Sequence, residues 1–145
     1  MKTENVLNVK NLGSKGDGVS DDTAAVQSAL DRASVVKIPE GDYRITSTLR
    51  VPSHTRIEAA SAARLFLCGE TPKKRGDFLL SNSDPMLGNE DIEISGGIWD
   101  GNNTGRLNVK ANLFDIGGYS GAVLNLSNVR NLALKDLTVA NSAAY

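Results

Sequence analysis

Two different periodicities divide this chain of 145 residues. Between Asp22 and Ala33 the apolar residues recur with a period of about 3.6 residues, which is typical of a helix with one buried face. Four side chains share that face: Val26, Ala29, Leu30 and Ala33. After Val35 the pattern changes to short apolar alternations, which favour strands. We therefore expect one helix near the start of the chain, followed only by strands and turns.

The predicted strands are short and separated by turn residues. They cover residues 35–38, 43–45, 49–51, 55–58, 64–67, 78–80, 91–94, 98–100, 123–126, 131–134 and 138–140. Such strands suit a coil built from three strands and three turns per rung better than a two-sheet sandwich.

An internal repeat supports the coil. Residues 91–100 and 131–140 superpose with a constant shift of 131 − 91 = 40 positions. The strongly apolar positions Ile92, Ile94 and Trp99 then fall on Leu132, Leu134 and Val139. In a solenoid such equivalent residues lie above one another, and each rung buries the apolar face of its neighbour. We expect these six side chains to point inward.

A glycine-rich segment precedes the helix. Gly13, Gly16 and Gly18 allow backbone angles that other residues avoid, and Asp21 or Asp22 can cap the helix that follows. A phosphate-binding loop would need Gly-Lys-Ser/Thr after four spacer residues, and a calcium loop would need alternating oxygen ligands with a terminal glutamate. The segment has neither pattern, so we interpret it as a turn and a helix cap.

The order Gly13-Ser-Lys-Gly-Asp-Gly18 followed by Asp21-Asp-Thr23 resembles the opening of pectate-lyase-like proteins. The segment Pro39-Glu-Gly-Asp-Tyr43 is similar to the Pro-x-Gly-x-Tyr turn that follows their capping helix. This resemblance implies an all-β fold, a right-handed parallel β-helix with a short N-terminal capping helix, truncated after about three rungs. It implies one domain, residues 1–145, with the glycine turn and capping helix in 1–34 and the rungs in 35–145.

The segment Ile92-x-Ile94-x-Gly-Gly-x-Trp99-Asp-Gly-Asn102 narrows the resemblance to polygalacturonase-like glycoside hydrolases, as does the turn Asn141-Ser142. This implies a parent protein that degrades pectic or other uronic-acid glycans. Those enzymes use paired carboxylates, which the family carries on Asn-Thr-Asp, Asp-Asp, Gly-His-Gly and Arg-Ile-Lys segments. None of these segments can be matched to a position here, since the pair Asp21-Asp22 belongs to the expected helix cap. No catalytic residue is therefore assigned, and we expect no activity from the chain alone.

Three alternatives remain open. Phage tailspikes and other surface fibres that bind glycans carry the same opening motif. A polysaccharide lyase of the same superfamily would need clustered acidic ligands and a basic residue, which are absent as a group. The third alternative is a self-contained structural or assembly module that stacks end to end with another copy. In a truncated coil the last rung, residues 131–140, would have no successor, which predicts self-association through that end.

Few side chains stand out as ligand contacts. Trp99 could stack on a sugar, but its alignment with Val139 favours the core. Asp100 and Asn102 suit a turn. Tyr119, in a glycine-rich loop, is the candidate exposed ring for substrate binding, and His54, the single histidine, is expected in a solvated turn.

Composition excludes several classes of function. Sixteen basic and 17 acidic residues give a formal charge of −1, so no global field attracts nucleic acid or an anionic membrane. The one tight basic run, residues 73–75, is expected at a loop tip. A single cysteine, Cys68, excludes internal disulfides and a cysteine-based zinc site, and we expect no metal or cofactor. No apolar signal core is present, which predicts a cytoplasmic chain or one already processed for secretion.

Overall fold

A computed structural model describes residues 4–68, 78–102 and 122–142. Within them, thirteen strands form three sheets, and all the strand pairs in register are parallel. Sheet A contains, in order, β1 (Val6–Asn8), β3 (Val35–Ile38), β6 (Thr55–Ala59), β9 (Asn89–Ser95) and β12 (Val129–Lys135). Sheet B contains β2 (Asp17–Asp21), β4 (Gly41–Ile45), β7 (Ala63–Leu67), β10 (Ile98–Asp100) and β13 (Thr138–Ala140). Sheet C contains β5 (Leu49–Val51), β8 (Leu80–Asn82) and β11 (Leu124–Asn125).

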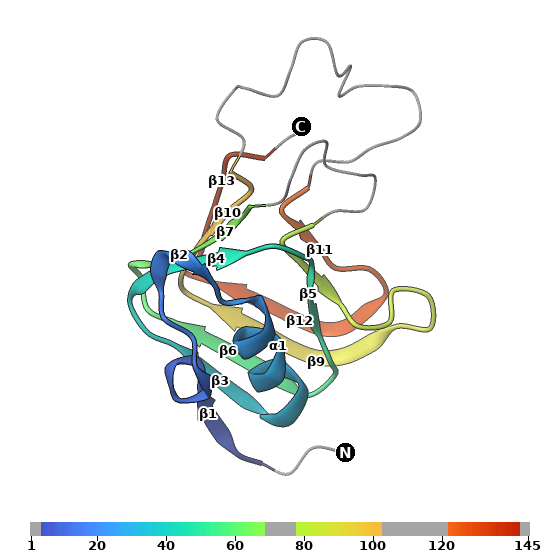
Figure 1. Cartoon of the computed structure of the whole chain (residues 1–145). Helices are drawn as coiled ribbons and strands as arrows, with labels where there is room; N and C mark the ends of the chain where they lie inside the picture. Colours follow the sequence, from blue (N-terminus) through green and yellow to red (C-terminus); the bar gives the residue numbers. More distant parts are fainter. Residues whose placement is uncertain (1–3, 69–77, 103–121, 143–145) are drawn as a thin grey trace.

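The chain visits the three sheets in turn, so that strands close in sequence lie in different sheets. Its rungs are β3-β4-β5, β6-β7-β8 and β9-β10-β11, and β12-β13 begin a further one. Figure 1 shows the rungs stacked in chain order, from blue to red. The parallel β-helix and its three rungs are confirmed.

The helix α1 (Thr23–Arg32) takes the place of a sheet C strand between β2 and β3. Its apolar face is buried as the sequence predicts, and the helix packs against β5 (Figure 1). The Gln27 side-chain amide completes the contact, because it donates to the Arg50 carbonyl oxygen at 2.9 Å and accepts the Arg50 N–H at 2.8 Å. A helical side chain thereby pairs with the strand edge as a neighbouring strand would, which reduces the exposure of that edge.

The glycine segment differs from the prediction. Residues Asp17–Asp21 form strand β2 against β4, where the sequence predicts only a turn. Asp22 occupies the N-cap position, but its buried carboxylate does not cap the helix and instead accepts the N–H groups of Lys15 at 2.8 Å and Gly16 at 2.9 Å. Asp21 accepts the Thr23 N–H at 3.0 Å. Asp22 therefore holds the glycine turn closed, and Asp21 supports the start of the helix.

Two further elements at the start were missed, and some boundaries differ, since β4, β9 and β12 each begin two residues earlier than predicted. Strand β1 and a 3₁₀ helix, Val9–Leu12, precede the glycine turn, and β8 lies two residues later than predicted. Each of these strands is held by pairing with a strand distant in sequence, which local alternation cannot report.

The repeat with a shift of 40 is confirmed by the register. Ile92 pairs with Leu132, Ile94 with Leu134, and Trp99 with Val139. Backbone conformation follows the same shift, because three stacked pairs share a positive φ: Gly88 and Asn128, Asp91 and Asn131, Gly96 and Asp136. Glycine, asparagine and aspartate share a tolerance for this conformation. The repeat is thus carried by turns as well as by apolar positions.

The core fills the space between the three sheets. Ile92, Ile94 and Trp99 are buried, and the Trp99 indole N–H donates to the Gly96 carbonyl oxygen at 3.0 Å. The prediction that Trp99 belongs to the core is confirmed. The equivalent residues Leu132, Leu134 and Val139 are 38%, 46% and 49% exposed, because no described strand stacks above β12 and β13.

Candidate functional site

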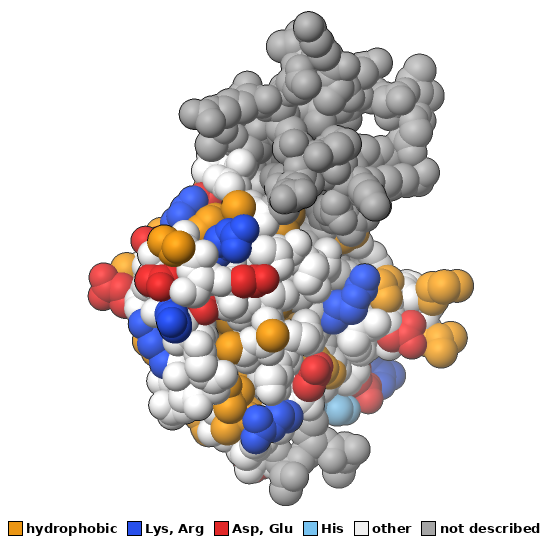
Figure 2. Space-filling view, in the orientation of Figure 1, with side chains coloured by type: hydrophobic (Ala, Val, Ile, Leu, Met, Phe, Trp, Pro, Cys, Tyr) orange, Lys and Arg blue, Asp and Glu red, His pale blue; other side chains and the backbone are white. Residues whose placement is uncertain are grey.

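A groove of about 570 Å³ crosses sheet A at the starts of β3 and β6 and the middle of β9 and β12. Its polar lining comes from the strands and from the residues just before β1, β3 and β6: Glu4, Ser34, His54, Thr55, Arg56, Asp91, Glu93 and Asn131. We call it the sheet A groove. Figure 2 shows the single histidine at the surface with acidic and basic side chains beside it. Because parallel strands stack in register, side chains from four rungs line one continuous surface.

The first row of the groove lies on the strands themselves. Val35 pairs with Arg56, Arg56 with Glu93, and Glu93 with Ala133, so a basic and an acidic residue lie between two small apolar ones. The Arg56 Nε atom is 3.7 Å from a Glu93 carboxylate oxygen, and the other oxygen is 3.3 Å from Lys135 Nζ. Exposed ion pairs of this kind contribute roughly 0–1 kcal/mol. A polar ligand can therefore replace them at little cost.

The second row lies two residues earlier in each rung, in the turn before β6 and within β9 and β12. His54, Asp91 and Asn131 stack on successive rungs with φ values of 59°, 57° and 61°. The Asn131 side-chain amide donates to Asp91 Oδ1 at 2.9 Å, and Asp91 Oδ2 lies 3.0 Å from His54 Nδ1. The His54 side chain is 45% exposed, so its predicted place in a solvated turn is confirmed. Its neighbours could not be foreseen, because residues 54 and 91 are 91 − 54 = 37 positions apart, which differs from the repeat of 40.

Glu90 adds a second carboxylate beside the imidazole. One of its oxygens lies 3.6 Å from His54 Nε2, and the other forms an ion pair with Arg130. The hydrogen bond that Arg130 donates to Glu90 raises the pKa of the Arg130 guanidinium. Among the described residues, His54, Glu90 and Asp91 are the group whose ligand atoms lie close enough, within 4.8 Å of one another, to hold a metal ion. The group has no local signal in the sequence, because it combines the turn before β6 with strand β9 of the next rung.

A different carboxylate belongs to Asp100, a buried residue at the end of β10 in sheet B. It accepts Arg64 Nε at 2.9 Å, the Asn141 side-chain amide at 2.9 Å and the Asn102 N–H at 2.7 Å. Burial raises the pKa of the Asp100 carboxyl group, but the three hydrogen bonds outweigh burial and lower the pKa below its ordinary value. A general acid needs the opposite shift.

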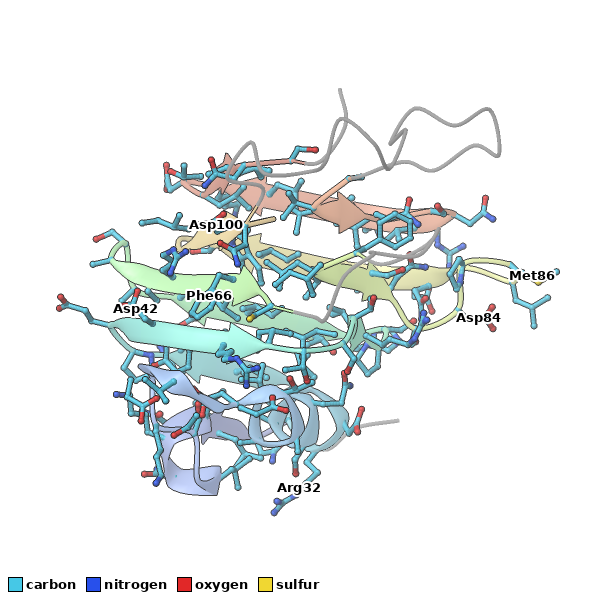
Figure 3. The ribbon with its side chains drawn as sticks, turned by 45° about the horizontal axis from the view of Figure 1, so that its top comes forward. Arg32, Asp42, Phe66, Asp84, Met86 and Asp100 are labelled. Atoms are coloured by element: carbon cyan, nitrogen blue, oxygen red, sulfur yellow. The ribbon has the colours of Figure 1, made fainter. Side chains whose placement is uncertain are left out.

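The surroundings of Asp100 fit a structural role. Figure 3 shows Asp42, Phe66 and Asp100 on neighbouring strands, and the Arg64 guanidinium lies 4.4 Å from the Phe66 ring centroid. The predicted turn role of Asp100 is confirmed by its bond to Asn102, and its bonds to Arg64 and Asn141 join neighbouring rungs.

Two of the predicted candidates, Tyr119 and the basic run 73–75, lie outside the described residues. No helix in the described ranges is both long and apolar enough to cross a membrane.

The family model described as rhamnogalacturonase A/epimerase, pectate lyase-like, matches residues 6–143. The chain belongs to this pectate lyase-like family. The resemblance predicted from the glycine turn and the Ile92–Asn102 motif is confirmed at that level.

Three known proteins show the range of its relatives. The pre-neck appendage protein of Bacillus phage phi29 is 29% identical over 131 residues, which are 90% of this chain and 15% of that protein. The solved structure of PfbA, a surface adhesin of Streptococcus pneumoniae, has a TM-score of 0.72 and 30% identity over 93% of this chain and 33% of its own. A family 28 exopolygalacturonase of Yersinia enterocolitica has a TM-score of 0.77 with 21% identity, over 97% of this chain and 35% of its own. The last likeness shows the fold alone, which is a right-handed parallel β-helix. The chain covers between 15% and 35% of the length of these three proteins.

Proposed function

We propose that this chain is a β-helix segment of a polysaccharide-recognising protein, and that the sheet A groove contacts the glycan. The observation that carries the proposal is the groove itself, which crosses four stacked strands and is lined by charged and amide side chains. An extended polymer lying across the rungs would meet polar side chains of different kinds at successive steps, among them Arg56, Glu93 and Asn131. Its hydroxyl groups both donate and accept, and the groove offers carboxylate acceptors beside guanidinium and amide donors.

The enzymatic form of this proposal is a parent glycoside hydrolase, polygalacturonase-like, that acts on pectic or other uronic-acid glycans. The family description and the motif from Ile92 to Asn102 support it. Hydrolysis needs one carboxyl group as acid and a second as base or nucleophile. Asp100 is hydrogen-bonded on both oxygens, and Glu90 and Asp91 are engaged by donors from β12. In this form the chain supplies binding surface and has no turnover of its own.

The second form is a glycan-binding appendage or surface adhesin that holds polysaccharide without cleaving it. A specific observation favours it: relatives near 30% identity that match nine-tenths of the chain include a phage appendage protein and a bacterial adhesin. A polysaccharide lyase of the same superfamily is a third form.

Binding by the groove can be tested with a matched pair of variants. Arg56→Ala removes a cation inside the groove, and Lys37→Ala removes one from sheet A outside it. We expect Arg56→Ala to weaken binding to a pectic or other uronic-acid polysaccharide about tenfold, as for a charged hydrogen bond of roughly 1.5 kcal/mol, and Lys37→Ala to change it little. Affinity electrophoresis measures both. Equal affinity in the two variants, or no binding to any glycan tested, would count against the proposal.

The same preparations decide whether the chain cleaves its ligand. We expect no release of reducing ends. Release that disappears on substitution of one of the chain's own carboxylates would show that the chain is an enzyme by itself.

We also propose that the chain self-associates through β12 and β13, the last described strands, where Leu132, Leu134 and Val139 are exposed beside the strand edges. Light scattering should give a mass that rises with concentration, and Leu134→Glu should abolish the rise. Leu87→Glu is the matched control, since Leu87 is 91% exposed in a turn of a different rung. A strictly monomeric mass at high concentration would contradict this proposal.

A further inference from the structure

We propose that His54, Glu90 and Asp91 form a binding site for a divalent transition-metal ion of the Zn²⁺ class. The three side chains come from two adjacent rungs and place one imidazole nitrogen and two carboxylate oxygens within 4.8 Å of one another. Small side-chain movements bring such atoms to the roughly 2.0–2.2 Å that Zn²⁺ requires from nitrogen and oxygen ligands.

The orientation of the two carboxylates supports the site. Asp91 uses Oδ1 to accept the Asn131 amide, which leaves Oδ2 facing His54 Nδ1 at 3.0 Å. Glu90 uses Oε2 for Arg130, which leaves Oε1 facing His54 Nε2 at 3.6 Å. Each carboxylate is therefore held by a donor from β12 and turns its other oxygen toward a different nitrogen of the imidazole, so a rotation of the exposed ring would bring one nitrogen to an ion shared with both oxygens. Outer donors that orient ligating groups in this way are a regular feature of metal sites.

The backbone fixes the positions of the three residues. The His54 N–H donates to the Glu90 carbonyl oxygen at 2.9 Å, which ties the turn before β6 to strand β9. All three side chains are between a third and a half exposed. An ion can therefore enter and exchange, and water can complete its coordination.

The donor set selects the class of ion. One imidazole nitrogen with two carboxylate oxygens suits Zn²⁺ and its neighbours in the transition series, whereas Mg²⁺ and Ca²⁺ prefer all-oxygen sites. The site stands independently of glycan binding, although His54 and Asp91 also line the sheet A groove.

The test is titration of the tag-free protein with Zn²⁺ by calorimetry, together with the proton NMR signals of its single imidazole. We expect one ion per chain, a shift of the His54 signals on binding, and affinity for Mg²⁺ at least a hundredfold weaker. His54→Asn should weaken Zn²⁺ binding at least tenfold, and asparagine preserves the turn because it tolerates positive φ, as Asn131 shows.

Two further variants make the result specific. Asn131→Ala leaves all three ligands in place but removes the donor to Asp91, and it should weaken binding about tenfold. Cys68→Ser should leave binding unchanged. Unchanged affinity in His54→Asn, loss of binding in Cys68→Ser, or no Zn²⁺ binding by the unmodified chain would each overturn the proposal.

Discussion

Replacing Trp99 with alanine should lower the free energy of unfolding by about 3 to 5 kcal/mol, as for other large-to-small core changes. Trp99 is fully buried and lies in register between Leu65 on one side and Val139 on the other. The substitution leaves a cavity between two rungs and removes the donor to the Gly96 carbonyl oxygen. Denaturant unfolding measures the loss.

The matched control is Met86→Ala. Met86 is 88% exposed, and Figure 3 shows it at the tip of a turn away from the sheets. We expect a change within about 0.5 kcal/mol there. A loss of less than about 1 kcal/mol in Trp99→Ala, together with weaker sugar binding, would make Trp99 a ligand platform and contradict its place in the core.

The second large effect is expected for Gly96→Ala. A Cβ atom at Gly96 would lie 2.1 Å from the Ala59 backbone oxygen of the neighbouring rung, and the residue has a φ of +75°. The strained backbone and the steric overlap together should cost about 2 to 5 kcal/mol, since each costs roughly 1–3 kcal/mol. Denaturant or thermal unfolding of the variant checks the value.

Gly13→Ala separates the two contributions. Gly13 also has a positive φ, +98°, but a Cβ atom there would meet nothing within 4 Å. We expect a loss of roughly 1–2 kcal/mol, from backbone strain alone. Equal losses in the two variants would show that the close contact between the rungs at Ala59 contributes nothing.

The elements that could be predicted from the sequence are those with a local signal. The helical face of Val26 and Leu30 and the alternation in residues 55–58 depend on neighbours within a few positions, and the structure contains both elements. The constant shift of 40 gave the register between β9 and β12 as well. Strand β2 has no such signal, because Asp17, Gly18 and Ser20 favour turns, and only its pairing with β4 makes it a strand.

The candidate site could not be predicted for a related reason. Sheet A advances by 56 − 35 = 21 positions from β3 to β6, by 92 − 55 = 37 from β6 to β9, and by 132 − 92 = 40 from β9 to β12. Only the last step leaves a repeat that a comparison of apolar residues can detect. His54, Asp91 and Asn131 share a positive φ and a place in the stack rather than a residue type. The candidate that the sequence did supply for sugar contact, Tyr119, lies outside the described residues, and the groove was not predicted.

The most direct test of the account is to map a bound glycan onto the chain. Backbone amide NMR signals of the labelled protein can be followed during titration with an acidic oligosaccharide. If the sheet A groove binds glycan, the largest shifts should fall at residues 54–56, 91–93 and 131–133, on three successive rungs. Saturable binding with shifts confined to sheet B or to the turn at residues 84–88 would contradict the account.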